Sequence, residues 1–441
     1  MNQQEKILVE KTENRPLIIW GARMTGIGFI RFAKKYNLNP IGFVDSDKSL
    51  HGKKIGSLTI GSPSTIPALK EKYKDLTVVV AVSIKEDEIL RTLKTMGIGD
   101  SDVVNYGGLC GTLFTIDISG SCNLKCPSCA HAMDDIDKPP KGFMAVDDFK
   151  KIIAKIKREV GIVGHISLYS WGEPFLHPHL EEIIKHAHSE GIATAVSTNF
   201  SISNTQRVNS IVEANPDYLK ISTSGFYPDV YNSTHTGGNV NLVKSNLYRL
   251  KYLIERYNLS TFVDVNYHVY KNNFDKDLNK MQELCDELSF TLSPCYANLT
   301  PIERLVDLME GRADAETKKI ADLLLVSVDE GLKATEEYRN LPCRFLTNQV
   351  NIHWDRSVPI CCVTFDRNTS TIAKDFLEVP LEQITRNKEN HPSCEKCTKY
   401  GFHSYLLGVN QKGWDEVAEK TKRKVREQTL NLPSPSREIQ S

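Results

Sequence analysis

The chain has 441 residues, 40% of them hydrophobic and 25% charged, and its 55 basic residues balance its 55 acidic residues. This length predicts two to three domains with packed cores. Zero net charge gives no sign of nucleic acid or an anionic membrane as a partner. No apolar run approaches the roughly 18 residues of a membrane-spanning helix, and the first residues do not form a signal peptide. The eleven cysteines are clustered and odd in number, so we expect a reducing cytoplasm rather than a secreted disulfide framework.

The first 110 residues alternate short strands with helices. Strands are predicted at residues 17–20, 40–44 and 77–82, and helices at residues 29–36 and 87–96. Strand–helix alternation with short loops predicts a parallel, Rossmann-like sheet.

A glycine-rich turn follows the first of these strands. Gly21, Gly26 and Gly28 imitate a dinucleotide-binding fingerprint, and Asp45 lies where the ribose-binding acid would be. Arg23, however, stands where a second glycine would let the backbone approach a pyrophosphate. We therefore expect poor NAD binding and favour a sheet that packs against another part of the protein.

Three cysteines follow a predicted strand at residues 113–118. Cys122, Cys126 and Cys129 form a C-x3-C-x2-C motif on the loop at the C-terminal end of that strand. Three thiolates on one short loop suit a four-iron iron–sulfur cluster with one open iron site. The alternative is a zinc knuckle, with His131 as its fourth ligand.

From this motif to about residue 300 the chain resembles the radical S-adenosylmethionine (SAM) enzymes, whose hallmark is the same cysteine spacing on the loop after the first barrel strand. In that family an aromatic residue usually precedes the third cysteine, where this chain has Ser128. A second family motif, Gly172-Glu173-Pro174, follows a predicted strand at residues 165–170. The resemblance implies a 4Fe-4S cluster and SAM, with this second motif against the SAM amino group.

The two strands beside these motifs belong to a series of six. Further strands are predicted at residues 192–197, 218–222, 262–267 and 290–293, separated by helical segments. The economical architecture is a partial (β/α)6 barrel with its chemistry at the C-terminal strand ends, and the resemblance implies the same barrel.

Polar residues end the third and fourth barrel strands. In the family such positions contact SAM, which implies that role for Ser197, Asn199 and Ser222. The arginine that relatives carry after the fourth strand is missing, and His235 is its candidate substitute. Four further histidines are predicted to be solvated: His177, His179, His186 and His188.

A second group of cysteines follows the barrel. Cys343 precedes a predicted hairpin of residues 349–354 and 358–362, and Cys394 and Cys397 follow it. Four such thiols suit either zinc or an iron–sulfur cluster. After a radical SAM barrel the arrangement resembles the SPASM/Twitch extension, in its single-cluster form. The resemblance implies an auxiliary 4Fe-4S cluster, with these ligands: Cys343, Cys361, Cys394 and Cys397. We prefer Cys361 to Cys362 because adjacent strand residues point to opposite faces.

The expected domains are a Rossmann-like domain (residues 1–110), a radical SAM partial barrel (111–300), a helical connector (301–342), a SPASM/Twitch-type cluster domain (343–408) and a charged, partly disordered tail (409–441). A weak resemblance of residues 44–60 to the appendage of sugar C-methyltransferases directs the substrate prediction towards sugars or nucleotide sugars.

The family resemblance implies reductive cleavage of SAM to a 5′-deoxyadenosyl radical, with flavodoxin or ferredoxin as the reductant. We expect oxidation of a sugar-like or aminocyclitol-like alcohol, with the auxiliary cluster as electron acceptor. One alternative is an epimerase in which Cys295, predicted two residues beyond the sixth strand, returns a hydrogen atom. Another is a peptide-modifying enzyme. A metal-bearing scaffold without turnover is disfavoured, because it has no use for the Gly172-Glu173-Pro174 motif.

Overall fold

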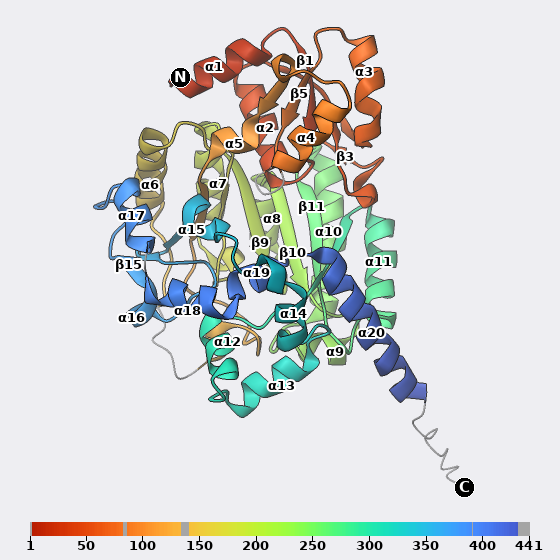
Figure 1. Ribbon diagram of the computed structural model, residues 1–441, viewed down its shortest axis with the longest axis vertical. Coiled ribbons are helices and arrows are strands. Elements are labelled where there is room, and N and C mark those ends of the chain that lie inside the picture. Colours follow the sequence, from red (N-terminus) through yellow and green to blue (C-terminus); the bar gives the residue numbers. More distant parts are fainter. Residues whose placement is uncertain (1, 83–85, 134–140, 390, 431–441) are drawn as a thin grey trace.

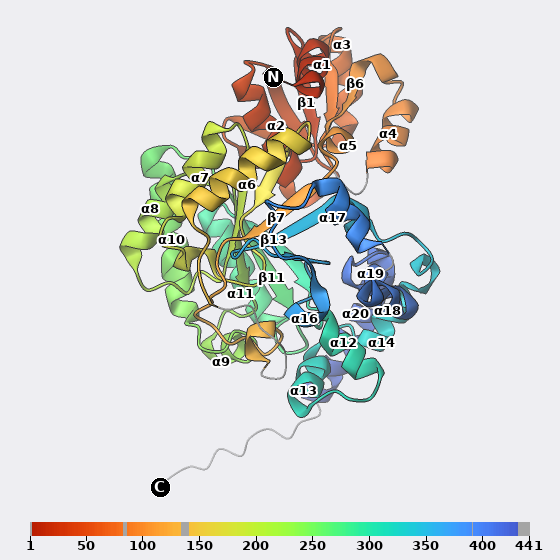
Figure 2. The ribbon, with the colours of Figure 1, turned by 90° about the vertical axis from the view of Figure 1, so that its left-hand side faces the viewer.

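The computed structural model describes residues 2–82, 86–133, 141–389 and 391–430. It contains two large sheets, one at the end of the other, and a small two-stranded sheet in the C-terminal segment, which lies against the side of the second large sheet (Figures 1 and 2). In these four ranges no helix is both long and apolar enough to cross a membrane.

The first sheet has six strands in the order β3-β4-β2-β1-β5-β6 and is parallel except for the β3–β4 pair. The predicted alternation of strands and helices is therefore present. Its strands are β1 (Pro16–Trp20), β2 (Asn39–Val44), β3 (Lys54–Ile55), β4 (Leu58–Gly61), β5 (Thr77–Val80) and β6 (Val103–Asn105). Its helices are α1 (Gln3–Thr12), α2 (Met24–Lys35), α3 (Ile66–Lys72), α4 (Glu86–Thr95) and α5 (Tyr106–Cys110).

The second sheet has seven parallel strands in the order β12-β11-β10-β9-β8-β7-β13. The six predicted barrel strands are all present. They are β7 (Leu113–Asp117), β8 (His165–Ser167), β9 (Ala193–Thr198), β10 (Tyr218–Thr223), β11 (Phe262–Val269) and β12 (Thr291–Tyr296). The helices between them are α6 (Val146–Glu159), α7 (Leu180–Ser189), α8 (Thr205–Glu213), α9 (Pro228–Asn232), α10 (Val240–Tyr257) and α11 (Lys276–Leu288).

The seventh strand, β13 (Gln349–His353), corrects the predicted hairpin. It pairs in parallel with β7, with Ile352 opposite Ile116, and both side chains are fully buried. The following short strand, β14 (Val358–Pro359), pairs instead with β15 (Thr371–Ala373). Burial of the apolar β13 side chains at the edge of the barrel sheet explains this preference, because it removes apolar surface from water.

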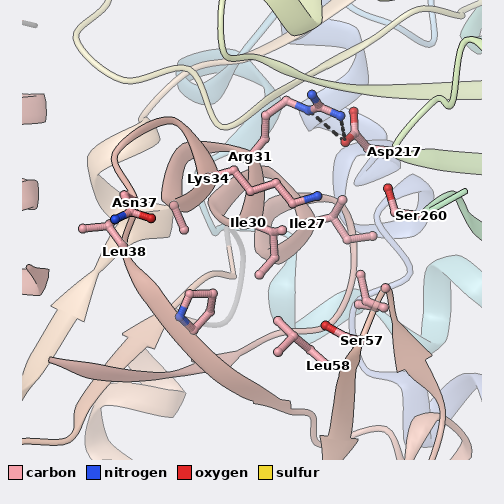
Figure 3. Close-up of a pocket in the computed structure, with 14 residues that line it drawn as sticks. Ile27, Ile30, Arg31, Lys34, Asn37, Leu38, Ser57, Leu58, Asp217 and Ser260 are labelled. Atoms are coloured by element: carbon pink, nitrogen blue, oxygen red, sulfur yellow. Dashed lines mark hydrogen bonds and ion pairs between the residues drawn. The ribbon is translucent and has the colours of Figure 1, made fainter. Parts of the chain in front are cut away.

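The first domain lies across the N-terminal end of the barrel strands (Figure 1). Arg31 of α2 makes an ion pair of 2.6 Å with Asp217, which immediately precedes β10 (Figure 3). A cavity of about 350 Å³ lies beside this pair, between α2, the β3–β4 turn and the barrel. Gly28 of α2 packs so closely that an added Cβ would lie 2.0 Å from the carbonyl oxygen of Gly164. The first domain therefore closes the floor of the barrel.

The C-terminal segment is mainly helical. Its helices are α12 (Ile302–Met309), α13 (Ala315–Leu323), α14 (Val328–Ala334), α15 (Arg344–Asn348), α16 (Arg367–Ser370), α17 (Leu381–Lys388), α18 (Pro392–Tyr400), α19 (Phe402–Leu406) and α20 (Gln411–Leu430).

Helix α20 occupies most of the segment predicted as a charged, partly disordered tail. Trp414 and Ala418 are buried, and the ring of Trp414 stacks on Tyr296 with centroids 6.1 Å apart. Two apolar side chains one helical turn apart give α20 a packed face, which the charged composition of the segment conceals. The predicted Pro- and Ser-rich end, residues 432–437, lies outside the described residues.

Candidate functional site

The loop that carries the first three cysteines is held in place by several hydrogen bonds. The backbone N–H of Lys125 donates to the carbonyl oxygen of Thr236 at 3.0 Å. The side-chain amide of Asn123 donates to the backbone carbonyl oxygen of Ser201 at 2.9 Å. Arg304 donates to the carbonyl oxygen of Pro127. These contacts fasten the loop to the segments that follow β9 and β10 and to α12.

The three thiols form an electrostatically coupled group. Burial, with the charge of Glu173, raises the pKa of Cys122 to about 12. Burial raises the pKa of Cys126, and the other two thiols raise it further; burial also raises that of Cys129. The side chain of Asn199 donates to the sulfur of Cys122 at 3.8 Å. Crowded thiols of this kind favour a cationic metal centre, which stabilises them as thiolates.

The arrangement of the three thiols distinguishes between a zinc site and an iron–sulfur cluster. Among the residues in the four described ranges, no three or more His, Cys, Asp or Glu side chains gather closely enough to hold one metal ion. A zinc site needs all its sulfurs about 2.3 Å from a single ion. A four-iron cluster is wider, because each cysteine binds a separate iron. The three thiols of Cys122, Cys126 and Cys129 match a four-iron cluster with one open iron site, whereas a closed zinc site would need a fourth ligand.

The second motif packs directly against the cluster loop. A Cβ at Gly172 would lie 1.6 Å from the carbonyl oxygen of Ser119, so only glycine allows this approach. The N–H groups of Trp171 and Gly172 donate to the carboxylate of Asp117 at 3.1 and 3.3 Å. The N–H of Glu173 donates to the carbonyl oxygen of Ser121 at 2.8 Å. The loops after β7 and β8 thus form one unit.

The Glu173 carboxylate is buried and already hydrogen-bonded. It accepts from the hydroxyl of Thr198 at 2.7 Å and from the N–H groups of Asn199 at 2.8 Å and Phe175 at 2.9 Å. Burial raises its pKa to about 7. In this arrangement the carboxylate joins the loop after β8 to the end of β9. Pro174 follows it and is also buried.

Two predicted SAM contacts lie side by side on the barrel interior. The hydroxyls of Ser197 and Ser222 are 3.2 Å apart. His235, the candidate substitute for an arginine, is buried and bonded through Nδ1 to the hydroxyl of Ser224 at 2.6 Å. Burial lowers its pKa to about 4. A neutral imidazole does not supply the positive charge of an arginine.

Two of the four histidines predicted to be solvated are not. His177 is buried, and its Nε2 lies 2.7 Å from the carbonyl oxygen of Met144. The Nε2 of His188 lies 2.8 Å from the carboxylate of Asp217. The sequence pattern of the helix did not show which of the four imidazole rings would be covered by residues near α6 and β10.

The C-terminal cysteines also come together. Cys343 precedes α15, Cys361 follows β14, and Cys394 and Cys397 lie in α18. Burial raises the pKa of Cys343, Cys394 and Cys397, and the charge of Cys361 raises each of them further. Four converging thiols fit a cluster of the predicted kind.

Cys361 and Cys362 are hydrogen-bonded to each other, and the hydrogen bond from Cys362 contributes most to lowering the pKa of Cys361 to about 7. Strand β14 ends at Pro359, so our argument from opposite strand faces is wrong. The choice of Cys361 rests instead on its electrostatic contact with the other three thiols.

A buried lysine lies beside this second group of thiols. Lys388 of α17 is 1% exposed and donates from Nζ to the carbonyl oxygens of Phe345 and Gln349. Its charge interacts with those of Cys361 and Cys394, among others. Sequence reasoning missed it, because Lys388 belongs to no motif and only the fold reveals its burial.

Cys295 lies within β12 rather than beyond it, opposite His268 in the register with β11. Its sulfur is half-buried and donates to the side-chain oxygen of Asn266 at 3.7 Å. The sixth strand is longer than predicted, since its pairing with β11 continues to Tyr296.

Comparison with known proteins finds similarity for the central part of the chain. Residues 116–285 match the family model described as the Radical SAM superfamily. A PqqA peptide cyclase of Bradyrhizobium diazoefficiens is 28% identical over 111 residues, which are 25% of this chain and 28% of that protein. A probable GTP 3′,8-cyclase of Methanococcus maripaludis is 31% identical over 134 residues, 30% of this chain and 43% of that protein. The chain thus spans less than half the length of these relatives.

The crystal structure of Streptococcus suis SuiB bound to S-adenosylmethionine matches with 13% identity and a TM-score of 0.45, over 72% of this chain and 79% of that one. Likeness at this level carries no argument about function. Residues 116–285 are thus similar to an enzyme superfamily, and this similarity leaves the reaction open.

Proposed function

We propose that this protein, whose central part is a radical SAM domain, cleaves SAM reductively and oxidises an organic substrate by a radical route. The observation that carries the proposal is the close packing of two loops. The loop with Cys122, Cys126 and Cys129 is joined to the Gly172-Glu173 turn through Asp117 and Ser119. A thiolate triad with an open iron site and a neighbouring turn of this shape suit a chelated SAM molecule.

The residues around this pair of loops have separate roles in the proposal. The three cysteines would hold the 4Fe-4S cluster, and the backbone of the Gly172-Glu173-Pro174 turn would lie against the SAM amino group. Glu173 acts as a positioning residue, because its carboxylate fixes the N–H of Asn199 beside Cys122. The remaining SAM contacts are assigned to the strand-end polar residues Ser197, Asn199 and Ser222.

A second 4Fe-4S cluster is proposed for the C-terminal thiols. Cys343, Cys361, Cys394 and Cys397 lie close enough for the charge of one to act on the others. Lys388 supplies a nearby positive charge that partly balances four thiolates.

With an electron from an external reductant, SAM and a cluster on Cys122, Cys126 and Cys129 would supply the chemistry to remove a hydrogen atom from a substrate C–H bond, and a cluster on the C-terminal thiols would accept one electron. In the favoured reaction the substrate is a sugar-like or aminocyclitol-like alcohol. Loss of the carbon-bound hydrogen atom, one electron and the hydroxyl proton leaves a ketone. The barrel walls and the first domain that closes the floor exclude water from the reactive species.

Two alternatives to dehydrogenation have specific support. Cys295 of β12 is half-buried beside Asn266, which suits a thiol that returns a hydrogen atom in an epimerase. Peptide modification is supported by the similarity to the PqqA peptide cyclase. Solvent deuterium at an inverted carbon, lost in Cys295→Ala, would favour the epimerase; a ketone made equally well by that variant would favour the dehydrogenase.

The proposed cleavage of SAM is tested on anaerobically reconstituted protein with dithionite, by measuring 5′-deoxyadenosine with chromatography and mass spectrometry. We expect the wild type to form it, and expect a variant with alanine at Cys122, Cys126 and Cys129 to form none. Cys110→Ala is the matched control, because this buried thiol lies outside both groups. Product formation by the triple variant would rule out the proposal.

A further inference from the structure

The interior of the barrel contains a lysine, Lys220 of β10. Its neighbours Leu219 and Ile221 are fully buried in the core between sheet and helices. Successive side chains of a strand point to opposite faces, so Lys220 faces the barrel interior, as Ser222 does. The strand register places it between Ser197 of β9 and Asp264 of β11.

Lys220 is half-buried and has no hydrogen bond or ion pair with any residue that the structure describes. Of the Asp264 carboxylate, which lies opposite Lys220, one oxygen is already engaged and the other is buried without a hydrogen bond to any described residue. Arg23 of the first domain pairs with Asp264 at 2.8 Å, and the hydroxyl of Tyr218 donates to the same oxygen. A partly desolvated ammonium without a counterion costs free energy, which a bound anion offsets.

Apart from the ion pair of Arg23 and Asp264, the groups around this ammonium are neutral and polar. Desolvation and the charges of His235 and Lys220 lower the pKa of His268 to about 3, so its imidazole is neutral at pH 7. Burial raises the pKa of the Cys295 thiol, although Lys220 partly offsets this. Asn266 contributes an amide on the same face. Beside the paired charges of Arg23 and Asp264, the Lys220 ammonium adds a further positive charge next to neutral hydrogen-bonding groups, an arrangement suited to an anionic group.

We propose that Lys220 binds an anionic group of the substrate, a carboxylate or a phosphate, inside the barrel. The inference rests on the proposed function, since the barrel interior is the substrate site of a radical SAM enzyme. It narrows the substrate class from alcohols in general to those that carry an acid group. SAM has a carboxylate of its own, but Lys220 lies two residues, or about 7 Å, deeper in β10 than Ser222, away from the cluster loop.

Cys295 offers a test that needs no identified substrate, because the charge of Lys220 acts on it. In the reconstituted protein, the rate of Cys295 alkylation by anionic iodoacetate is divided by the rate for neutral iodoacetamide, using peptide mass spectrometry. We expect Lys220→Met to lower this ratio about fivefold or more at low ionic strength, and Lys220→Arg to keep it. Lys422→Met is the matched control, since Lys422 lines a separate cavity of about 410 Å³ that also borders Cys295.

Competition distinguishes the two acid groups. Slower iodoacetate alkylation of the wild type with inorganic phosphate alone would assign a phosphate, and slower alkylation with succinate alone a carboxylate. An alkylation ratio unchanged in Lys220→Met, or protection by neither anion, would overturn the proposal. Iron content and circular dichroism report whether each variant folds.

SAM binding separates this inference from the proposed function. Lys220→Met is expected to bind SAM in equilibrium dialysis and to form 5′-deoxyadenosine without substrate, as the wild type does. Loss of both in this variant alone would mean that Lys220 holds the SAM carboxylate, against our proposal. Failure of the wild type to form 5′-deoxyadenosine would contradict the proposed function, while the alkylation ratios would still test Lys220.

Discussion

At the scale of single residues, the buried ammonium of Lys388 links the C-terminal thiols to the barrel sheet, since it donates to the carbonyl oxygens of Phe345 in α15 and of Gln349, the first residue of β13. Lys388→Met keeps much of the side-chain volume but leaves two carbonyl groups unsatisfied and four thiolates without a nearby cation. We expect this variant to lose about half of the iron bound by the reconstituted wild type, measured by iron and sulfide analysis.

The same variant should still form 5′-deoxyadenosine, because the first cluster is held by other residues. Lys396→Met is the matched control: Lys396 is exposed on α18 beside Cys397, and its loss should leave the iron content unchanged. Equal iron in Lys388→Met and wild type would show that Lys388 does not support the second cluster.

The residue scale also shows what spacing predicts and what it does not. The proposed cluster ligands Cys122, Cys126 and Cys129 can be predicted because they lie within eight residues of one loop, and their spacing in the sequence keeps them close in space. The roles inferred for Lys220 and Lys388 depend on strand register and on burial by segments far along the chain. No local pattern distinguishes these two lysines from the many that are solvated.

At the scale of elements, helix α20 covers the β12 edge of the barrel sheet. Trp414 packs between Tyr296 and Tyr405, at centroid distances of 6.1 and 5.2 Å, and the hydroxyl of Tyr296 donates to Asp415. Covering an edge strand prevents it from pairing with another molecule. We expect Trp414→Ala to cost about 3–5 kcal/mol of unfolding free energy and to promote aggregation, measured by denaturant unfolding and light scattering.

Glu416→Ala is the comparison for this prediction, because Glu416 is exposed on the same helix and such changes usually stay within about 0.5 kcal/mol. If both variants unfold alike, α20 does not stabilise the barrel edge.

Strand prediction succeeded where the partner is the next strand in the chain and failed where it is distant. The six barrel strands follow from apolar segments separated by amphipathic helices. The alternation around Val350 and Ile352 identifies β13 as a strand, but not its partner. Its pairing with β7 depends on the unfilled edge of a sheet formed much earlier in the sequence, which local periodicity does not encode.

At the scale of the whole molecule, the first domain and the barrel share one interface. Arg23 connects Asp47 of its own domain with Asp264 of the barrel, at 3.0 and 2.8 Å. Asp45, predicted at the ribose position, instead accepts from the N–H of Ala22 at 2.7 Å. The turn that imitates a dinucleotide site therefore faces the barrel floor. These contacts support the preference for a docking sheet, while poor NAD binding stays a prediction.

The substitution Gly28→Ala adds one methyl group at this interface and so tests whether the two domains depend on close packing there. A Cβ there would lie 2.0 Å from the carbonyl oxygen of Gly164, whereas a Cβ at Gly61 of the same domain would have no neighbour closer than 3.8 Å. Gly28→Ala must therefore push α2 away from the barrel and strain the Arg23–Asp264 and Arg31–Asp217 pairs. We expect a lower melting temperature and faster proteolysis between the first domain and β7, with Gly61→Ala close to wild type. Equal proteolysis rates for the two variants would show that the domains do not depend on this contact, and that Arg23 closes the barrel floor without support from α2.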